Sequence, residues 1–98
     1  MATYYILRRA NGDILTLERG GHTYIAVWDS ELGVRRSKNS NPDLIVYVPA
    51  VLNRQWIERR IPGNRRYFLV DSADPDLETG REITEEELFG QPEFRKAA

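Results

Sequence analysis

Few side chains in this sequence belong to the kinds that carry out covalent or acid–base chemistry. His22 is the single histidine and cysteine is absent, which excludes disulfides, thiolate zinc sites and a cysteine nucleophile. His22 follows Gly20-Gly21, and no partner lies at a metal-ligand or general-base spacing from it. No serine stands in a nucleophile-elbow motif. The sequence therefore predicts no catalytic residue, no metal site and no cofactor, and we expect a protein that is not an enzyme.

An acidic segment near the C-terminus has the ligand spacing of a calcium-binding loop. Its carboxylates occupy positions 1, 3, 5, 9 and 12 of a twelve-residue window, at Asp74, Asp76, Glu78, Glu82 and Glu85. Position 6 of such a loop normally needs glycine for a sharp turn, but Thr79 stands there and Gly80 comes one residue later. This departure favours a solvated acidic turn over a calcium site.

Arginine pairs are the feature that most suggests a binding function. Arginine outnumbers lysine by 12 to 2, and its planar guanidinium binds carboxylate or phosphate through two hydrogen bonds. Arg8-Arg9 lies in a predicted strand, where adjacent residues point to opposite faces, so this pair is not expected to share one surface. The predicted binding surface consists of the remaining pairs and one lysine: Arg35, Arg36, Lys38, Arg59, Arg60, Arg65 and Arg66.

The distribution of charge leaves the partner of this surface open. The net charge is −1, but residues 1–70 carry 11 basic and 6 acidic groups, whereas residues 71–98 carry 3 basic and 9 acidic groups. Such asymmetry indicates an anionic partner, or basic and acidic segments of one chain that pair with each other. We expect an unknown protein partner. Nucleic acid on the same surface is the alternative, and a homo-oligomer also remains open.

Local patterns predict the elements that must position the arginines. Residues 3–9 and 14–19 flank Asn11-Gly12, which predicts a hairpin with a two-residue type I′ turn and Arg8 facing Leu15. Residues 22–28 are rich in β-branched and aromatic side chains and predict a third strand. Residues 29–43 are polar and predict a surface loop.

The second half of the chain predicts a strand, a helix, a further strand and a short helix. Residues 44–48 form a continuous apolar run typical of a buried strand, and Pro49 is suited to the first turn of a helix over residues 50–60. Leu52 and Trp56 would bury this helix against the sheet. Residues 66–71 predict a strand. The last helix is predicted by the capping-box spacing of Thr84 and Glu87 and is ended by Gly90.

These elements predict an α+β fold in a single domain over residues 1–90. The expected sheet is antiparallel with four to five strands, the helix at about residues 50–60 packs on one face, and a short C-terminal helix follows. Residues 91–98 are predicted to be a disordered tail. No apolar run approaches ~18 residues and the N-terminus lacks a signal-peptide pattern, so we expect a cytoplasmic protein that does not enter a membrane.

The order of these features also carries a family resemblance over roughly residues 4–89. A hairpin at residues 4–18 is followed by a strand ending in Val27-Trp28, a helix with Gln55-Trp56-Ile57, and a closing Glu85-Glu86-Glu87-Leu88. This order resembles a group of small bacterial domains of uncharacterised function, distantly similar to the SseB-type secretion-associated domains. The resemblance implies an α+β fold and supplies no catalytic residues. The sequence as a whole predicts a non-enzymatic binding or regulatory module.

Overall fold

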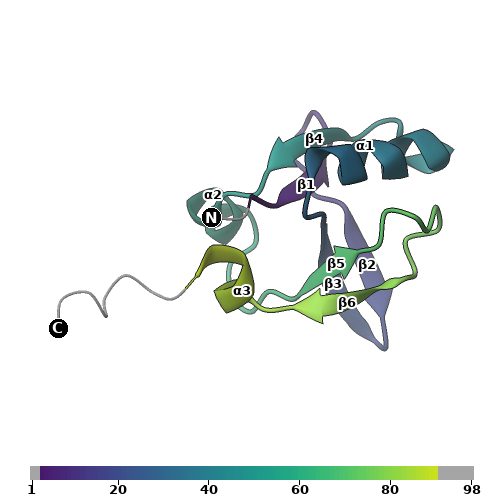
Figure 1. Cartoon of the computed structure of the whole chain (residues 1–98). Helices are drawn as coiled ribbons and strands as arrows, with labels where there is room; N and C mark the ends of the chain where they lie inside the picture. Colours follow the sequence, from purple (N-terminus) through teal and green to yellow (C-terminus); the bar gives the residue numbers. More distant parts are fainter. Residues whose placement is uncertain (1–2, 91–98) are drawn as a thin grey trace, which may run out of the picture.

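The computed structural model describes residues 3–90, which form six strands, three α-helices and one 3₁₀ helix (Figure 1). The α+β class predicted from the sequence is confirmed, and the predicted tail at residues 91–98 lies outside the described residues. In chain order the elements are β1 (Tyr5–Arg8), β2 (Thr16–Arg19), β3 (His22–Val27), α1 (Glu31–Ser40), η1 (Pro42–Leu44), β4 (Val48–Val51), α2 (Arg54–Arg60), β5 (Tyr67–Val70), β6 (Gly80–Ile83) and α3 (Glu85–Phe89).

The strands form two sheets, where the sequence predicts one. The larger sheet has the order β2-β3-β5-β6, and its central pair, β3 and β5, is parallel. β1 and β4 form a two-stranded antiparallel sheet, which a bridge between Tyr5 and Trp28 joins to the end of β3. In Figure 1, β1, β4 and α1 make an upper layer over the four-stranded sheet. The predicted all-antiparallel sheet is therefore wrong in its β3–β5 pairing.

Alternate residues of β3 contribute to two separate cores. Ile25 and Val27 pack on one face with side chains of α2 and α3, including Ile57 and Leu88. Ala26 and the following Trp28 pack on the other face with Leu7 of β1, Val34 of α1 and Leu44 of η1. Because side chains of a strand alternate between faces, each helix covers one side of the same central strand.

The predicted two-residue turn at Asn11-Gly12 is wrong. Gly12 has a positive φ of 95° but Asn11 does not, whereas a type I′ turn needs positive φ at both positions. The Gly12 N–H donates to the Arg9 carbonyl (2.9 Å) and the Arg9 N–H donates to the Asp13 carbonyl (2.8 Å). These bonds enclose three residues, with glycine in the last place, which is the usual arrangement of a three-residue hairpin loop.

The longer loop also changes the register and the partner of β1. Arg8 lies opposite Ile14, one residue away from the predicted Leu15, and the Leu15 N–H donates to the Leu7 carbonyl (2.9 Å). A shift of one residue exchanges the two faces of a strand. The two segments meet only near the loop, through this bridge and the bonds beside it, because β1 pairs along its length with β4 and β2 pairs with β3.

The predicted surface loop at residues 29–43 is also wrong, because it contains α1 and η1. The Ser30 side chain accepts a hydrogen bond from the Gly33 N–H (2.9 Å) and caps α1. The buried side of α1 consists of Gly33, Val34 and Ser37. The Ser37 hydroxyl accepts the indole N–H of Trp28 (2.9 Å). Small and polar residues therefore pack this helix, and a search for an apolar stripe does not detect them.

The segment predicted as a buried strand and a long helix folds differently. Residues 44–48 end η1 and enter β4, and Pro49 is paired with Leu7 inside β4 instead of opening a helix. α2 begins later because the Asn53 side chain accepts the Trp56 N–H (2.9 Å) and caps it. Leu52 is buried as predicted, and Trp56 is half-buried against the same core.

Three predictions from local patterns are confirmed. Residues 22–27 form β3 and residues 67–70 form β5. α3 carries the predicted capping box of Thr84 and Glu87 and ends at Gly90. Strand β6, which precedes α3, has no counterpart among the predicted elements. Within residues 3–90, no helix has the length and apolar character needed to cross a bilayer.

Candidate binding surface

Two arginines from distant parts of the chain line one hollow beside the β1–β2 turn. Arg9 follows β1, Arg60 ends α2, and both line this hollow with Tyr47 and Ile61. The guanidinium of Arg60 lies against Gly12, where an added Cβ would stand 2.8 Å from Nη2. The same guanidinium is 3.6 Å from the Asp13 carboxylate. The absence of a side chain at Gly12 thus lets the end of α2 dock on the turn.

Arg59 and Arg60 flank Trp56 on the outer side of α2. Residues three and four apart on a helix are neighbours, so Trp56 lies beside both arginines. Ile57, on the inner side, is fully buried and fixes the rotation of the helix. Arg59 is exposed and makes no hydrogen bond or ion pair within residues 3–90.

Arg8 reaches the same side of the molecule from β1. It lies opposite Val48 and Ile14, and it shares a strand face with Ile6, which packs in the core beneath α2. β1 ends at Arg8, so the alternation expected for a strand does not apply to Arg9 in the turn. Arg8, Arg9, Arg59 and Arg60 together form what we call the basic surface. In the described part of the chain, only Arg60 of these four contacts an acidic side chain, that of Asp13.

Exposed aliphatic side chains border the basic surface. The segment between η1 and β4 carries Ile45, Val46 and Val48, whose exposed fractions are 77%, 54% and 45%. Tyr47, within this segment, lines the hollow with Arg9, and Val48 is the cross-strand neighbour of Arg8. Positive charge and apolar area therefore meet at one edge of the upper layer.

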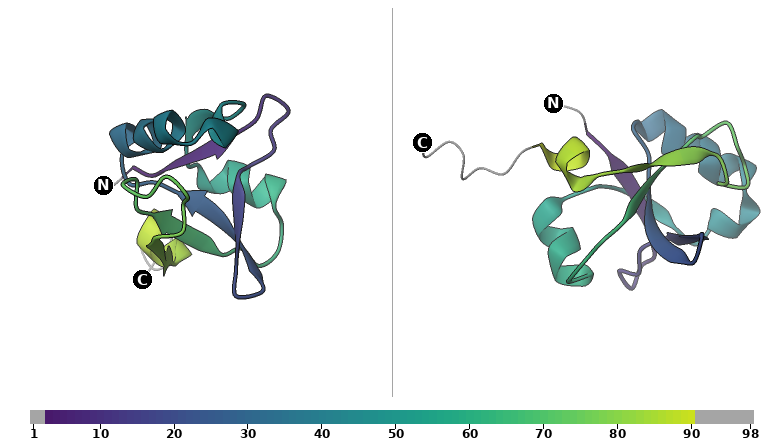
Figure 2. Two further views of the ribbon diagram at one scale, coloured as in Figure 1. Left: turned by 90° about the vertical axis from the view of Figure 1, so that its right-hand side faces the viewer. Right: turned by 90° about the horizontal axis from the view of Figure 1, so that it is seen from below.

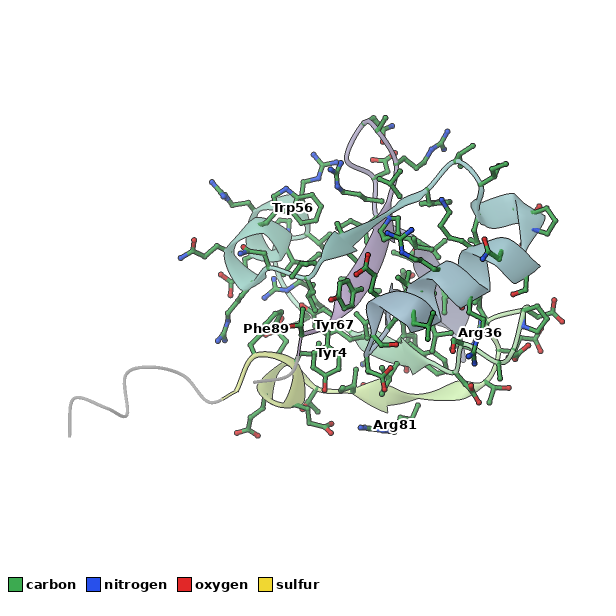
Figure 3. All side chains as sticks on the ribbon, turned by 45° about the horizontal axis from the view of Figure 1, so that its top comes forward. Tyr4, Arg36, Trp56, Tyr67, Arg81 and Phe89 are labelled. Atoms are coloured by element: carbon green, nitrogen blue, oxygen red, sulfur yellow. The ribbon has the colours of Figure 1, made fainter. Side chains whose placement is uncertain are left out.

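The α1 residues of the predicted surface are separated from those of α2. Figures 1 and 2 place α1 and α2 at opposite ends of the molecule, and Figure 3 shows Arg36 far from Trp56. Arg35 pairs with Glu31 of its own helix (2.8 Å), and Arg36 is exposed beside it. Lys38 alone turns toward the hollow, because its ammonium donates to the Tyr47 carbonyl. The structure thus joins Lys38 to Tyr47, which lines the hollow, and leaves Arg35 and Arg36 apart from Arg59 and Arg60.

Arg65 and Arg66 hold the C-terminal acidic segment. The Arg65 side chain has 10% of its area exposed and donates to the Glu85 carboxylate (2.9 Å), which also accepts the Tyr67 hydroxyl (2.8 Å). Arg66 faces Glu82 at 3.6 Å. These pairs fix α3 and β6 to β5. The possibility that the arginines neutralise the chain's own acidic segment therefore applies to Arg65 and Arg66.

The pKa values of this cluster reflect its partial burial. Desolvation would raise the pKa of Glu85, but the hydrogen bonds from Tyr67 and Arg65 outweigh it and lower the pKa below its usual value of 4.5. Burial, followed by the hydrogen bond to Glu85, raises the pKa of the Tyr67 hydroxyl. Tyr67 remains a neutral donor and Glu85 a charged acceptor at neutral pH.

The carboxylates of the acidic window with calcium-loop spacing do not converge on one point where a metal ion could bind. The Asp74 carboxylate accepts the N–H groups of Asp76, Glu78 and Thr79 in its own loop (3.0, 3.1 and 2.9 Å), and its pKa is lowered by the Thr79 hydroxyl together with these N–H groups. Glu82 and Glu85 lie beside arginines instead. Within residues 3–90, no group of three or more acidic or histidine side chains is placed to hold a metal ion.

Comparison with known proteins adds no relative. No protein-family model, no curated protein and no solved structure matches the chain. The resemblance to small bacterial SseB-type domains therefore stays a prediction, and the candidate surface is defined by its own geometry alone.

Proposed function

We propose that the chain is a non-enzymatic binding module that captures an acidic segment of a protein partner on the basic surface. The hollow that Arg9 and Arg60 line with a single carboxylate, that of Asp13, carries the proposal, and Arg8 and Arg59 are the residues next to them in the sequence. A patch of one sign attracts a partner of opposite charge and speeds its association. The aliphatic border at residues 45–48 adds apolar area that a protein segment covers on binding.

The character of the surface favours protein over nucleic acid. Single-stranded nucleic acid binds to open aromatic faces, whereas Trp56 and Tyr47 are both half-buried. Duplex binding normally accompanies a strongly basic domain, whereas this chain has a net charge of −1. Exposed isoleucine and valine side chains offer nothing to a phosphate backbone but do fit the apolar residues of a protein segment.

Selection from a random peptide library tests the proposal and requires no candidate partner. We expect the selected peptides to be rich in aspartate and glutamate. Arg59→Glu should weaken their binding about fivefold or more, the equivalent of about 1 kcal/mol for one charge contact. Arg36→Glu is the matched control, because Arg36 is also exposed on a helix and lacks an ion pair within residues 3–90, but lies far from the surface.

Three outcomes are informative. Both variants should melt close to the wild-type temperature, since neither side chain makes a hydrogen bond or ion pair within residues 3–90. Selected peptides without acidic enrichment, or equal loss of binding in the two variants, would contradict the proposal. Oligonucleotides that bind through Arg59 where acidic peptides do not would replace it with a nucleic-acid function.

A further inference from the structure

Strand β4 has a neighbour on one side only. It pairs with β1 in the register Tyr5↔Val51 and Arg8↔Val48, and no other strand of the described chain lies along it (Figure 1). The Leu52 N–H donates to the Tyr4 carbonyl (2.8 Å), which identifies a hydrogen-bonded pair at this position. Because such pairs alternate along an antiparallel ladder, Val48 and Ala50 direct their backbone groups to β1, while Pro49 and Val51 direct theirs outward.

The outward groups form a short strand edge that pairs with no other strand of the described chain. Proline has no N–H, so its place at an outward position costs β4 no bond to β1. The edge presents the Pro49 carbonyl together with the N–H and carbonyl of Val51. The strand carries no charged residue, and Val51 is 57% exposed. Edge strands in proteins are usually covered or charged, because they pair readily with a further strand.

The charged residues near the edge of β4 indicate which kind of segment binds there. Arg8 lies opposite Val48, Lys38 donates to the Tyr47 carbonyl just before β4, and Arg9 lines the hollow beside Tyr47. A second copy of this chain would bring these cations against their equivalents, and Pro49 would supply no donor to a symmetric ladder. An acidic segment brings carboxylates in place of these cations, and it meets the missing Pro49 donor once, whereas a symmetric ladder meets it twice.

On this basis, and resting on the proposed function, we propose that the acidic segment binds as an added β-strand on the free edge of β4. Main-chain bonds to Pro49 and Val51 give it an extended conformation. Its apolar side chains lie on the face of Val51, and its carboxylates lie on the face of Val48 and extend toward Arg8. The partner chemistry is thus an alternating acidic and β-branched sequence, not an acidic helix.

Two synthetic peptides of equal length and charge test the conformation, one alternating glutamate with valine and one combining glutamate with alanine in a helix-forming order. We expect the Glu/Val peptide to bind about tenfold more tightly than the Glu/Ala peptide. It should also protect the Val51 amide of the wild-type chain from hydrogen exchange. This exchange measurement needs no variant and therefore does not depend on the folding of one.

Val51→Pro removes the outward donor without breaking a bond to β1, and Val51→Thr keeps it. We expect Val51→Pro to weaken binding of the Glu/Val peptide about tenfold, and Val51→Thr to weaken it less than about twofold. Binding that responds to Arg59→Glu but leaves Val51→Pro and the Val51 amide unaffected would refute strand addition and leave the proposed function standing. Absence of binding by both peptides at millimolar concentration would refute both. A wild-type dimer that Val51→Pro dissociates would identify a second copy as the occupant and overturn the acidic strand.

Discussion

Ser37→Ala tests whether the hydrogen bond between α1 and β3 stabilises the upper layer. The change removes the hydroxyl that accepts the Trp28 indole N–H, and the exposed fractions of Ser37 and Trp28 are 0% and 1%, so water does not replace the lost acceptor. A buried donor without a partner costs about 1–3 kcal/mol, and alanine returns about 0.5 kcal/mol through helix propensity. We expect a net loss of about 0.5–2.5 kcal/mol, which lowers the melting temperature by about 2–20 °C in a domain of this size.

Ser40→Ala is the matched control in the same helix. The Ser40 hydroxyl is exposed and donates to the Arg36 carbonyl one turn earlier (3.0 Å), so its removal leaves no buried group unpaired. Urea unfolding followed by far-ultraviolet circular dichroism measures both variants without relying on Trp28 fluorescence. If Ser37→Ala and Ser40→Ala change the free energy of unfolding equally, the assigned role of the buried bond is refuted.

Two further predictions concern the turn and the C-terminal cluster. Gly12→Ala and Gly63→Ala should each lower the free energy of unfolding by about 1–2 kcal/mol, because both have positive φ and the Arg60 guanidinium beside Gly12 is the outer end of a flexible side chain that can move aside; a much lower urea midpoint for Gly12→Ala would contradict this. Glu85 has a lowered pKa in the folded state, so its contribution to stability is complete above about pH 4.5 and is lost as the pH falls through the folded value. Glu85→Gln should therefore destabilise the protein at neutral pH and weaken the dependence of its unfolding free energy on pH in acid. Parallel plots of unfolding free energy against pH for the wild-type and Glu85→Gln proteins would contradict the assigned contacts of Glu85 with Arg65 and Tyr67.

The elements that the sequence predicts correctly are those whose signals are local. β3 combines β-branched and aromatic residues in one run, and the capping box of α3 needs only Thr84 and Glu87 three residues apart. The missed helix α1 has Gly33, Val34 and Ser37 on its buried side. Ser37 bonds to Trp28, Val34 packs with it, and Gly33 lies against Ser30 and Ser72. These tertiary contacts leave no apolar pattern in the neighbouring sequence.

The candidate site is less predictable because tertiary structure assembles it. Arg59 and Arg60 belong to the predicted surface, since they end a helix before a turn. A strand through both Arg8 and Arg9 would separate their side chains, but β1 ends at Arg8. The partner of β1 is β4, which lies some forty residues later and contains a proline, and pairing at that distance leaves no local pattern.

The parallel ladder between β3 and β5 has a consequence for how the chain is assembled during synthesis. Ile25 pairs with Tyr67, and α1, β4 and α2 all lie between them in the sequence. The β2–β3 hairpin closes through Gly20-Gly21 and forms on the scale of microseconds. The other edge of β3 stays unpaired until β5 has left the ribosome. Closing the long loop between them then costs conformational entropy, which the β3–β5 ladder offsets only once it has formed. Nascent chains that stop before β5 therefore expose β3 to chaperones and to one another.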